Sequence, residues 1–134
     1  MLKTIDVRTS SREEFVDITA KIKQVISESG ISSGICTLYV PHTTAAVTIN
    51  EGADPSVKRD MLVYLNKLVP ERGDYRHMEG NSDAHIKTSF MGSSEIVIIE
   101  NGKPLLGTWQ SIYFCEFDGP RSRQIHIKVI SEND

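Results

Sequence analysis

Hydrophobic and polar residues alternate over several short runs of the chain. A period of two places successive side chains on opposite faces, so such runs are typical of β-strands with one buried face. In the last run, Ile125, Ile127 and Val129 fall on one face and Lys128 falls on the other. The pattern predicts strands at residues 3–9, 14–18, 34–40, 44–50, 95–100, 108–117 and 123–130.

Elsewhere, apolar residues recur every three to four positions, which is the spacing of one helix face. This spacing predicts helices from Thr19 to about Gly30, from Asp54 to Pro70, and from Asn81 or Ser82 to Met91. The second helix has the clearest start, because Asp54 can cap it and Pro55 suits its first position. In the third helix, Ile86 and Phe90 are expected to form the buried side.

The order of these elements predicts an α+β fold. Strands with interspersed helices, followed by a terminal β-meander, give mostly antiparallel sheet layers with two to three helices. One alternative concerns the start of the chain, where Ser10 and Glu13 match a capping box that would begin the first helix earlier. The chain has no internal repeat or linker, and its 134 residues suit one compact domain, 1–134.

The composition of the chain limits the kinds of partner that the protein is expected to bind. The formal net charge is −3, so no strong positive field attracts nucleic acid or acidic lipid. No apolar run approaches the roughly 20 residues that cross a bilayer, and the first four residues do not begin a signal peptide. Cys36 and Cys115 lie in strand-like runs and are expected to be buried thiols, with a disulfide as the alternative. We therefore expect a cytoplasmic protein with no membrane or nucleic-acid partner.

Two polar stretches hold three of the four histidines. His42 follows Pro41 between two strands, with Thr43 beside it, and His77 and His85 flank a loop and a helix start. Imidazole binds metals and transfers protons near neutral pH. Three histidines that leave an open position suit a catalytic metal such as zinc, whereas histidines at a helix start also suit a phosphate. Metal, anion and purely structural roles remain open at this point.

Other polar residues carry weaker signals. Glu51 ends a strand and is a candidate general base or Mg²⁺ ligand, the alternative being a solvated loop. Arg121 either occupies a surface turn or reaches an anionic ligand. Glu116 and Arg123 flank that turn and are expected to pair across the hairpin. Trp109 is assigned to core or subunit packing.

Four motifs together resemble the YjbQ family. They are residues 41–51 (PHTTAAVTINE), the spacing His77-x₃-Asn81-x₃-His85, residues 106–110 (LGTWQ) and residues 118–121 (DGPR). The motifs keep the family's order and approximate spacing, and the resemblance extends from about residue 3 to residue 129. Four motifs in order are far more specific than one short match.

The resemblance implies an α+β subunit that assembles as a homotrimer. It also implies a secondary thiamine-phosphate synthase activity, which joins hydroxymethylpyrimidine diphosphate to thiazole phosphate and releases diphosphate. A divalent metal, Zn²⁺ or Mg²⁺, is the expected cofactor, with no organic cofactor, and a small phosphorylated molecule is the expected ligand. The alternatives are a metal-dependent hydrolase of small phosphorylated compounds and a non-catalytic trimer that binds a phosphorylated ligand.

By match with the family pattern, the three histidines carry the site, with Asn50, Glu51 and Asn81 as neighbours, and the roles below are the expectations that we attach to it. His42, His77 and His85 are the expected metal ligands. Glu51 and His85 are the expected catalytic residues. The expected substrate-binding residues are Thr43, Asn50, Asn81 and Arg121. The sequence does not decide whether these residues meet within one subunit or at a boundary between subunits.

Overall fold

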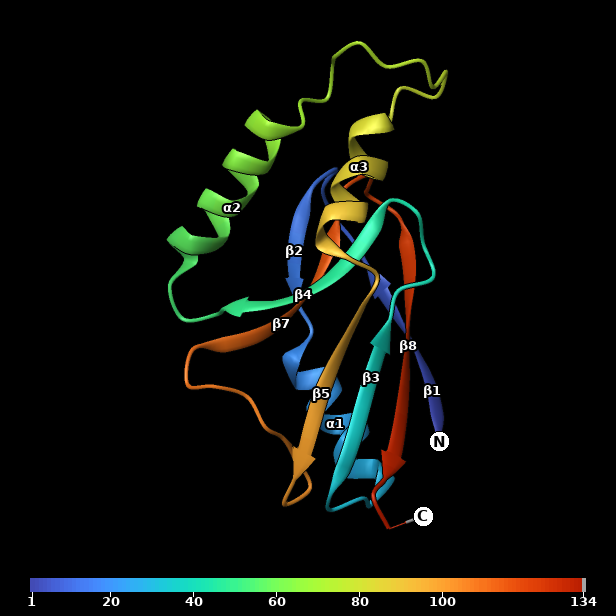
Figure 1. Ribbon diagram of the computed structural model, residues 1–134, viewed down its shortest axis with the longest axis vertical. Helices are drawn as coiled ribbons and strands as arrows, with labels where there is room; N and C mark the ends of the chain where they lie inside the picture. The colour runs from blue at the N-terminus through green and yellow to red at the C-terminus, as the bar shows by residue number, and fades with distance from the viewer. Residues whose placement is uncertain (134) are drawn as a thin grey trace.

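Antiparallel pairing organises the chain into two sheets in the computed structural model, which describes residues 1–133 (Figure 1). The helices are α1 (Thr19–Ser29), α2 (Pro55–Leu68) and α3 (Ser82–Met91). The strands are β1 (Leu2–Arg8), β2 (Glu14–Asp17), β3 (Gly34–Tyr39), β4 (Ala45–Glu51), β5 (Ser94–Glu100), β6 (Lys103–Pro104), β7 (Gln110–Glu116) and β8 (Ser122–Ser131). One sheet has the strand order β1-β8-β3-β5-β6 and the other has the order β2-β7-β4. All strand pairs within the described residues are antiparallel, so the predicted α+β fold is confirmed.

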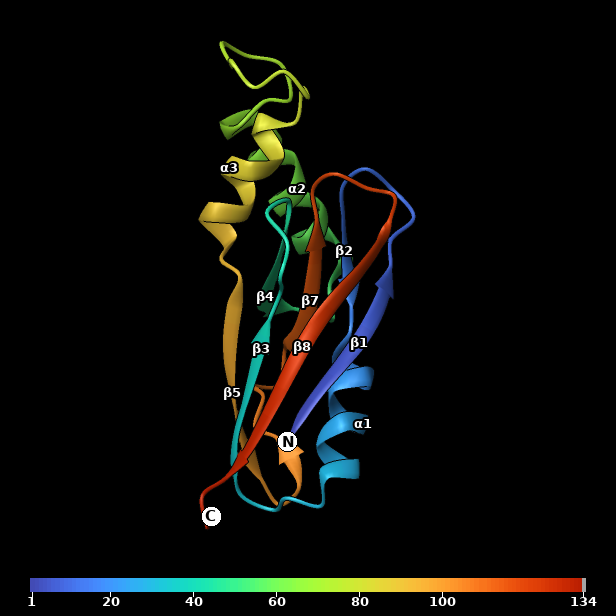
Figure 2. The same ribbon diagram turned by 90° about the vertical axis from the view of Figure 1, so that its right-hand side faces the viewer.

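The two sheets form two layers, and the helices lie at opposite ends of them (Figure 2). α1 lies at one end, and α2 and α3 lie at the other, where α3 contacts β4. The loops that join β1 to β2, β3 to β4 and β7 to β8 gather at the α3 end (Figures 1 and 2). This end therefore collects polar residues from distant parts of the sequence.

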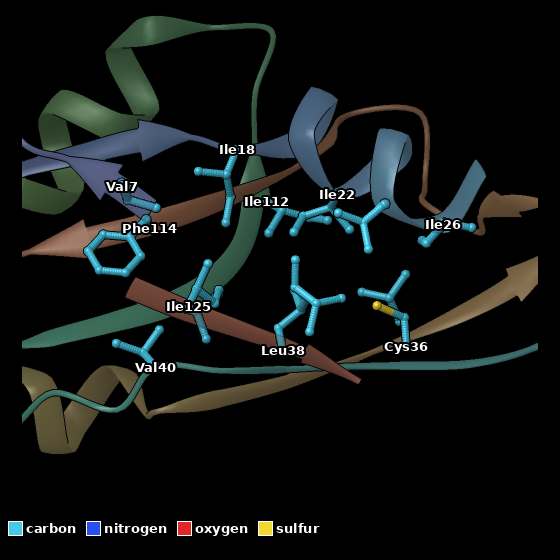
Figure 3. Close-up of a cluster of buried hydrophobic side chains, with 14 of the residues drawn as sticks. Val7, Ile18, Ile22, Ile26, Cys36, Leu38, Val40, Ile112, Phe114 and Ile125 are labelled. Atoms are coloured by element: carbon cyan, nitrogen blue, oxygen red, sulfur yellow. The ribbon is translucent and has the colours of Figure 1, made fainter. Parts of the chain in front are cut away.

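The main core lies between the two sheets and α1 (Figure 3). Leu38 of β3 and Ile125 of β8 lie in one cluster with Phe114 of β7 and Ile22 of α1, and all four side chains are fully buried. Burying one such side chain stabilises the fold by about 1.5–3 kcal/mol. The alternation seen in the sequence thus sets which face of each strand points inward.

Both cysteines are free and buried, as predicted, and no disulfide joins them. Cys36 lies in the main core, and Cys115 lies in a second apolar cluster with Phe117. Burial raises the pKa of the Cys36 thiol to about 11 and also raises the pKa of Cys115. Both thiols therefore stay protonated near neutral pH, as is typical of buried structural cysteines.

Two helix ends lie where the sequence predicted them, at residues whose own chemistry ends or caps a helix. Gly30 ends α1 with φ of 71°, a left-handed conformation that glycine adopts without steric cost. Asp54 caps α2, because its Oδ1 accepts a hydrogen bond from the backbone N–H of Ser56 at 2.9 Å. The alternative helix start at Ser10 is wrong, since the Ser10 hydroxyl bonds Glu14 at 2.7 Å and β2 follows.

α2 lies on the outside of the molecule. It is the longest helix, with 14 residues, and none of them is fully buried. Met61 and Leu65 pack against the second apolar cluster, whereas Leu68 is exposed. Within residues 1–133, no helix is long and apolar enough to cross a membrane.

The inner face of α3 is polar. Asp83 and Lys87 are fully buried, whereas Phe90 is 64% exposed and Ile86 is only half-buried. The prediction that Ile86 and Phe90 form the buried side is therefore wrong. Charged residues replace them because partners from other elements pair with the buried charges, which removes most of the cost of burying them.

Candidate functional site

An open pocket of about 460 Å³ lies where the loop after α2 meets the start of α3. His77 from the loop and His85 from α3 line it, and their rings meet edge to face with centroids 5.4 Å apart. Arg76 and Ser82 line the same pocket. Small-molecule sites commonly measure roughly 300–1,000 Å³, so this pocket can hold a small metabolite. It brings together two imidazoles, a guanidinium and a hydroxyl.

Helix geometry places His85 in the pocket. Ser82 and His85 are three residues apart and therefore share one face of α3. The pocket lies at the helix N-terminus, where free backbone N–H groups attract anions. Asn81 precedes the helix, but its side chain does not cap it. The Asn81 Oδ1 atom is buried without a hydrogen-bond partner among residues 1–133.

A buried charge network holds the start of α3 against its neighbours. Lys87 Nζ lies 3.2 Å from carboxylate oxygens of Glu13 and of Asp83. It also donates to Asn66 Oδ1 at 2.6 Å. Arg12 donates two hydrogen bonds to Asp83, at 3.1 and 3.3 Å. The network ties the β1–β2 loop, α2 and α3 together.

The same contacts keep Asp83 ionised. Burial acts to raise the pKa of Asp83, but the hydrogen bonds and charges of Arg12 and Lys87 outweigh it and lower this pKa. Removal of either cation would leave buried carboxylate charge without full compensation. The position of His85, two residues after Asp83, thus depends on charges that lie outside the pocket.

His42 lies on the β3–β4 loop and does not line the histidine pocket. Its Nε2 accepts a hydrogen bond from the backbone N–H of Gln124 at 2.9 Å. Burial lowers the pKa of His42, and the positive charge of Arg123 lowers it further. His42 is therefore neutral near neutral pH, with its proton on Nδ1. Thr43 beside it is exposed.

Asn81 and Arg121 meet through a shared carboxylate. Asp118 Oδ2 accepts a hydrogen bond from Asn81 Nδ2 at 2.8 Å and another from Arg121 Nη2 at 3.1 Å. Under this turn, Arg123 Nε donates to Glu116 Oε1 at 2.8 Å, and both side chains are buried. The predicted pairing of Glu116 with Arg123 is confirmed. It fixes the β7–β8 turn that carries Asp118 and Arg121.

Asn50 and Glu51 lie at the opposite end of β4 from the histidine-bearing loop. β4 has seven residues, and a strand of that length spans about 20 Å. Glu51 Oε2 accepts a hydrogen bond from the backbone N–H of Ala53 at 2.8 Å. With Trp109, Asn50 and Glu51 line a separate pocket of about 220 Å³. Within one chain, the structure does not bring them to the histidines.

Trp109 is 63% exposed, so its assignment to the core is wrong. The indole lies at the start of β7, where the backbone N–H of Gly52 bonds the Trp109 carbonyl at 2.8 Å. Packing against another subunit remains a prediction for this side chain.

The three histidines do not form a metal site within one chain. Among residues 1–133, no group of three or more His, Cys, Asp or Glu side chains is placed to hold a metal ion. His77 Nε2 lies 3.9 Å from Glu79 Oε2, which is too long for a hydrogen bond. His77 and His85 offer two ring nitrogens, and a complete metal site here would need ligands from outside the chain.

Sequence reasoning missed Arg76 and the buried charges of α3. Arg76 stands in a polar loop with no periodic pattern, so nothing in the sequence distinguished it. Asp83 and Lys87 have the four-residue spacing of an ion pair on one helix face. This spacing indicates the pair, but it does not show that Arg12 from the distant β1–β2 loop also bonds Asp83.

The chain matches one protein family over nearly its whole length. The family is described as "UPF0047 protein YjbQ-like", and residues 3–132 match it. The chain belongs to the YjbQ family. The resemblance seen in the four motifs is thereby confirmed.

Relatives of high similarity are known from archaea and bacteria. The UPF0047 protein MJ1081 of Methanocaldococcus jannaschii is 55% identical over 132 residues, which cover 98% of this chain and 96% of that protein. The UPF0047 protein YugU of Bacillus subtilis is 53% identical over 131 residues, which cover 97% and 99% of the two chains. These relatives span the same domain, and their names state no activity.

Solved structures share the fold. The crystal structure of an uncharacterised conserved YjbQ/UPF0047 protein from Clostridium acetobutylicum is 56% identical, with a TM-score of 0.94 over 96% of this chain and 99% of that one. A YbjQ-like protein of unknown function from Sulfolobus solfataricus is 33% identical, with a TM-score of 0.94 over 98% and 97% of the two chains. The fold thus persists while two thirds of the residues change.

Proposed function

We propose that the pocket formed by His77 and His85 binds phosphorylated substrate, and that the protein is a cytoplasmic enzyme with secondary thiamine-phosphate synthase activity. The observation that carries the proposal is the pair of imidazoles, 5.4 Å apart, at the start of α3. The reaction itself follows from the family resemblance. It joins hydroxymethylpyrimidine diphosphate to thiazole phosphate and releases diphosphate.

The chemistry of the pocket lining supports an anionic ligand. Arg76, His77, Ser82 and His85 supply hydrogen-bond donors, and Asp74 is the one carboxylate that lines the pocket within residues 1–133. Guanidinium groups recognise phosphate with two parallel hydrogen bonds. A helix N-terminus adds partial positive charge. These features favour a phosphate or diphosphate over a neutral or cationic ligand.

The same donors suit the bond changes of the reaction. The thiazole nitrogen forms a bond to the methylene carbon of the pyrimidine, the bond from that carbon to the diphosphate oxygen breaks, and its electron pair leaves with diphosphate. Negative charge grows on the leaving oxygen, so donors aimed at it lower the barrier. His85 and Arg76 are assigned this role, and Ser82 is assigned to binding.

A divalent metal is the expected cofactor, since the resemblance implies a pocket that can hold a metal or an anion. Three ligands for it do not come together within residues 1–133 of one chain. The proposal therefore assigns stabilisation of the leaving group to side chains, and the contribution of Mg²⁺ or Zn²⁺ is measured by assays with and without each ion.

We also propose the homotrimer, on the basis of an exposed apolar face of the five-stranded sheet. Ile35 pairs in register with Ile98 on one side and Ile130 on the other, so the three form a row across β5, β3 and β8. Their exposed fractions are 46%, 52% and 53%. Exposed apolar patches of this kind mark protein contacts. Sedimentation equilibrium should give three times the chain mass of 15.0 kDa, and Ile98→Asp should lower it. A monomer at micromolar concentration would contradict this proposal.

The test of the activity is direct. Purified protein should form thiamine phosphate from the two precursors, detected by mass spectrometry. His85→Ala should slow the reaction by about 10²–10⁴-fold, the usual contribution of a proton-donating side chain. His126→Ala is the matched control, because His126 lies on β8 and bonds Thr4 instead of lining the pocket. Equal activity in the His85 variant and the unaltered protein would overturn the proposal.

A further inference from the structure

A second, smaller pocket lies beside the β7–β8 turn at the same end of the molecule. Its volume is about 280 Å³, and its lining residues are Arg8, Thr9, Pro120, Arg121 and Ser122. Two of these five side chains are guanidinium groups, and none is a carboxylate. Arg121 is paired with Asp118 just outside this lining, so Arg8 supplies the uncompensated positive charge in a chain whose net charge is −3.

The two arginines come from different strands that the sheet brings together. Arg8 at the end of β1 lies opposite Ser122 at the start of β8. Val7 and Thr9 on either side are buried, so Arg8 points outward. Within residues 1–133, Arg8 forms no ion pair, as is also true of Arg72 and Arg76, whereas the other four arginines each have a carboxylate partner.

Arg121 is already oriented for a ligand. Its Nε donates to the Asp118 carbonyl at 2.9 Å, and its Nη2 donates to Asp118 Oδ2 at 3.1 Å. The other amino group, Nη1, has no partner among residues 1–133. The side chain is half exposed, at 50%. An arginine held on one edge loses little further rotational freedom when its other edge binds an anion.

The floor of this pocket is rigid. Thr9 is only 4% exposed, and its hydroxyl donates to the buried Glu116 at 2.8 Å while accepting from the backbone N–H of Arg121 at 2.9 Å. Gly119 packs so closely that a Cβ there would lie 2.8 Å from Glu116 Cγ and 2.9 Å from Thr9 Oγ1. The turn therefore cannot shift without breaking buried contacts.

A short bridge connects this pocket to the histidine pocket. Asp118 Oδ2 bonds both Arg121 and Asn81, at 3.1 and 2.8 Å. Asn81 in turn precedes Ser82, which lines the histidine pocket. The two pockets thus flank a single hydrogen-bonded unit at the α3 end of the molecule.

We infer that the pocket between Arg8 and Arg121 is a second anion subsite that takes a phosphate or diphosphate group. At about 280 Å³, it suits one end of a ligand better than a whole metabolite, since complete ligand sites are roughly 300–1,000 Å³. The inference rests on the proposed function for its purpose: a reaction between two phosphorylated molecules needs two anion subsites. The histidine pocket supplies one, and this pocket supplies the other.

The test is a titration of the full-length protein with inorganic pyrophosphate at low ionic strength, followed by backbone amide NMR. The amide signals of Thr9, Arg121 and Ser122 should shift and saturate. Arg8→Gln should weaken binding at these signals by at least about tenfold, the usual effect of losing a charged hydrogen bond. The amide of His85 should respond as before. Arg59→Gln is the control, because it removes the same charge from an exposed position on α2.

The outcomes separate this inference from the proposed function. Absence of a saturable shift at Thr9, Arg121 and Ser122, or a shift that Arg8→Gln leaves unchanged, would overturn the second subsite. A shift at these residues that depends on Arg8, without any response at His85, would support the second subsite and count against the histidine pocket. His85→Ala should abolish the response near α3 and leave that near Arg8.

Discussion

The two faces of α3 differ in composition and in role. The inner face carries Asp83 and Lys87, which are fully buried in a network of ion pairs. The outer face carries Ser82 and His85, which line an open pocket. The helix has only ten residues. The residues that stabilise the fold and the residues that line the pocket are therefore separated by a fraction of a helical turn.

This difference shows how structural and ligand-binding roles can be told apart for the polar residues of a short helix. Charged side chains form the inner face of α3 because Arg12, Glu13 and Asn66 meet them from other elements. His85 occupies the outer face, where its side chain has no ion pair or hydrogen bond to residues 1–133 and meets the His77 ring. Burial with satisfied partners indicates a structural role, whereas convergence of donors on an open pocket indicates binding.

The largest expected effect comes from the inner face. Lys87→Met removes the cation that contacts Glu13 and Asp83, and it should lower the free energy of unfolding by about 3–5 kcal/mol, the usual cost of breaking a buried ion pair. Urea denaturation followed by circular dichroism measures the free energy of unfolding. Lys21→Met, at an exposed position of α1, is the control. Equal stability of the two variants would mean that the network contributes nothing to the fold.

Acid should next weaken the two buried ion-pair networks, that of Asp83 on α3 and that of Glu116 on β7. In Glu116, as in Asp83, burial acts to raise the pKa, but hydrogen bonds from Arg123, Asp118 and Thr9 outweigh it and lower the value. A carboxylate with a lower pKa in the folded state contributes stability that is present above its unfolded pKa and is lost as the pH falls through its folded pKa.

The free energy of unfolding should therefore stay level near neutral pH and decline below about pH 4–4.5, where unfolded carboxylates take up protons. Denaturation curves recorded at successive pH values measure the decline. Stability that rises as the pH drops through this range would show that the pKa values of Asp83 and Glu116 are raised instead.

The smallest effect is expected at Phe90, an exposed residue at the C-terminal end of α3. Phe90→Ser replaces a side chain that is 64% exposed, so the free energy of unfolding should change by less than about 0.5 kcal/mol. Thermal denaturation of this variant beside Ala84→Ser, which alters a buried residue of the same helix, measures the contrast. A larger loss for Phe90→Ser than for Ala84→Ser would contradict the distinction between buried and exposed positions of α3.

Much of the fold follows from local sequence patterns, because strand alternation and helix capping act within a few residues. Asp54 and Gly30 mark helix ends by their own chemistry, and the alternation of β8 sets its buried face. The two-residue strand β6 was missed, since so short a run has no period to detect. The burial of Lys87 was missed because it depends on Arg12 and Glu13, more than seventy residues away.

The site was predicted in part. The sequence singled out His77 and His85, and the structure places them in one pocket. The sequence did not show that His42 and Glu51 stay outside this pocket, because the packing of the strands and loops decides which motif residues meet. The arginines at positions 8 and 76 carry no motif, and only their position in the fold reveals them.

The central claim is that the outer face of α3 binds a phosphorylated ligand through its histidines. NMR of the imidazole rings during titration with inorganic phosphate tests it most directly. The ring signals of His77 and His85 should shift together and saturate at one phosphate concentration, while the ring of His126 stays unchanged. Unmoved His77 and His85 signals, or shifts of the same size at His126, would contradict the claim.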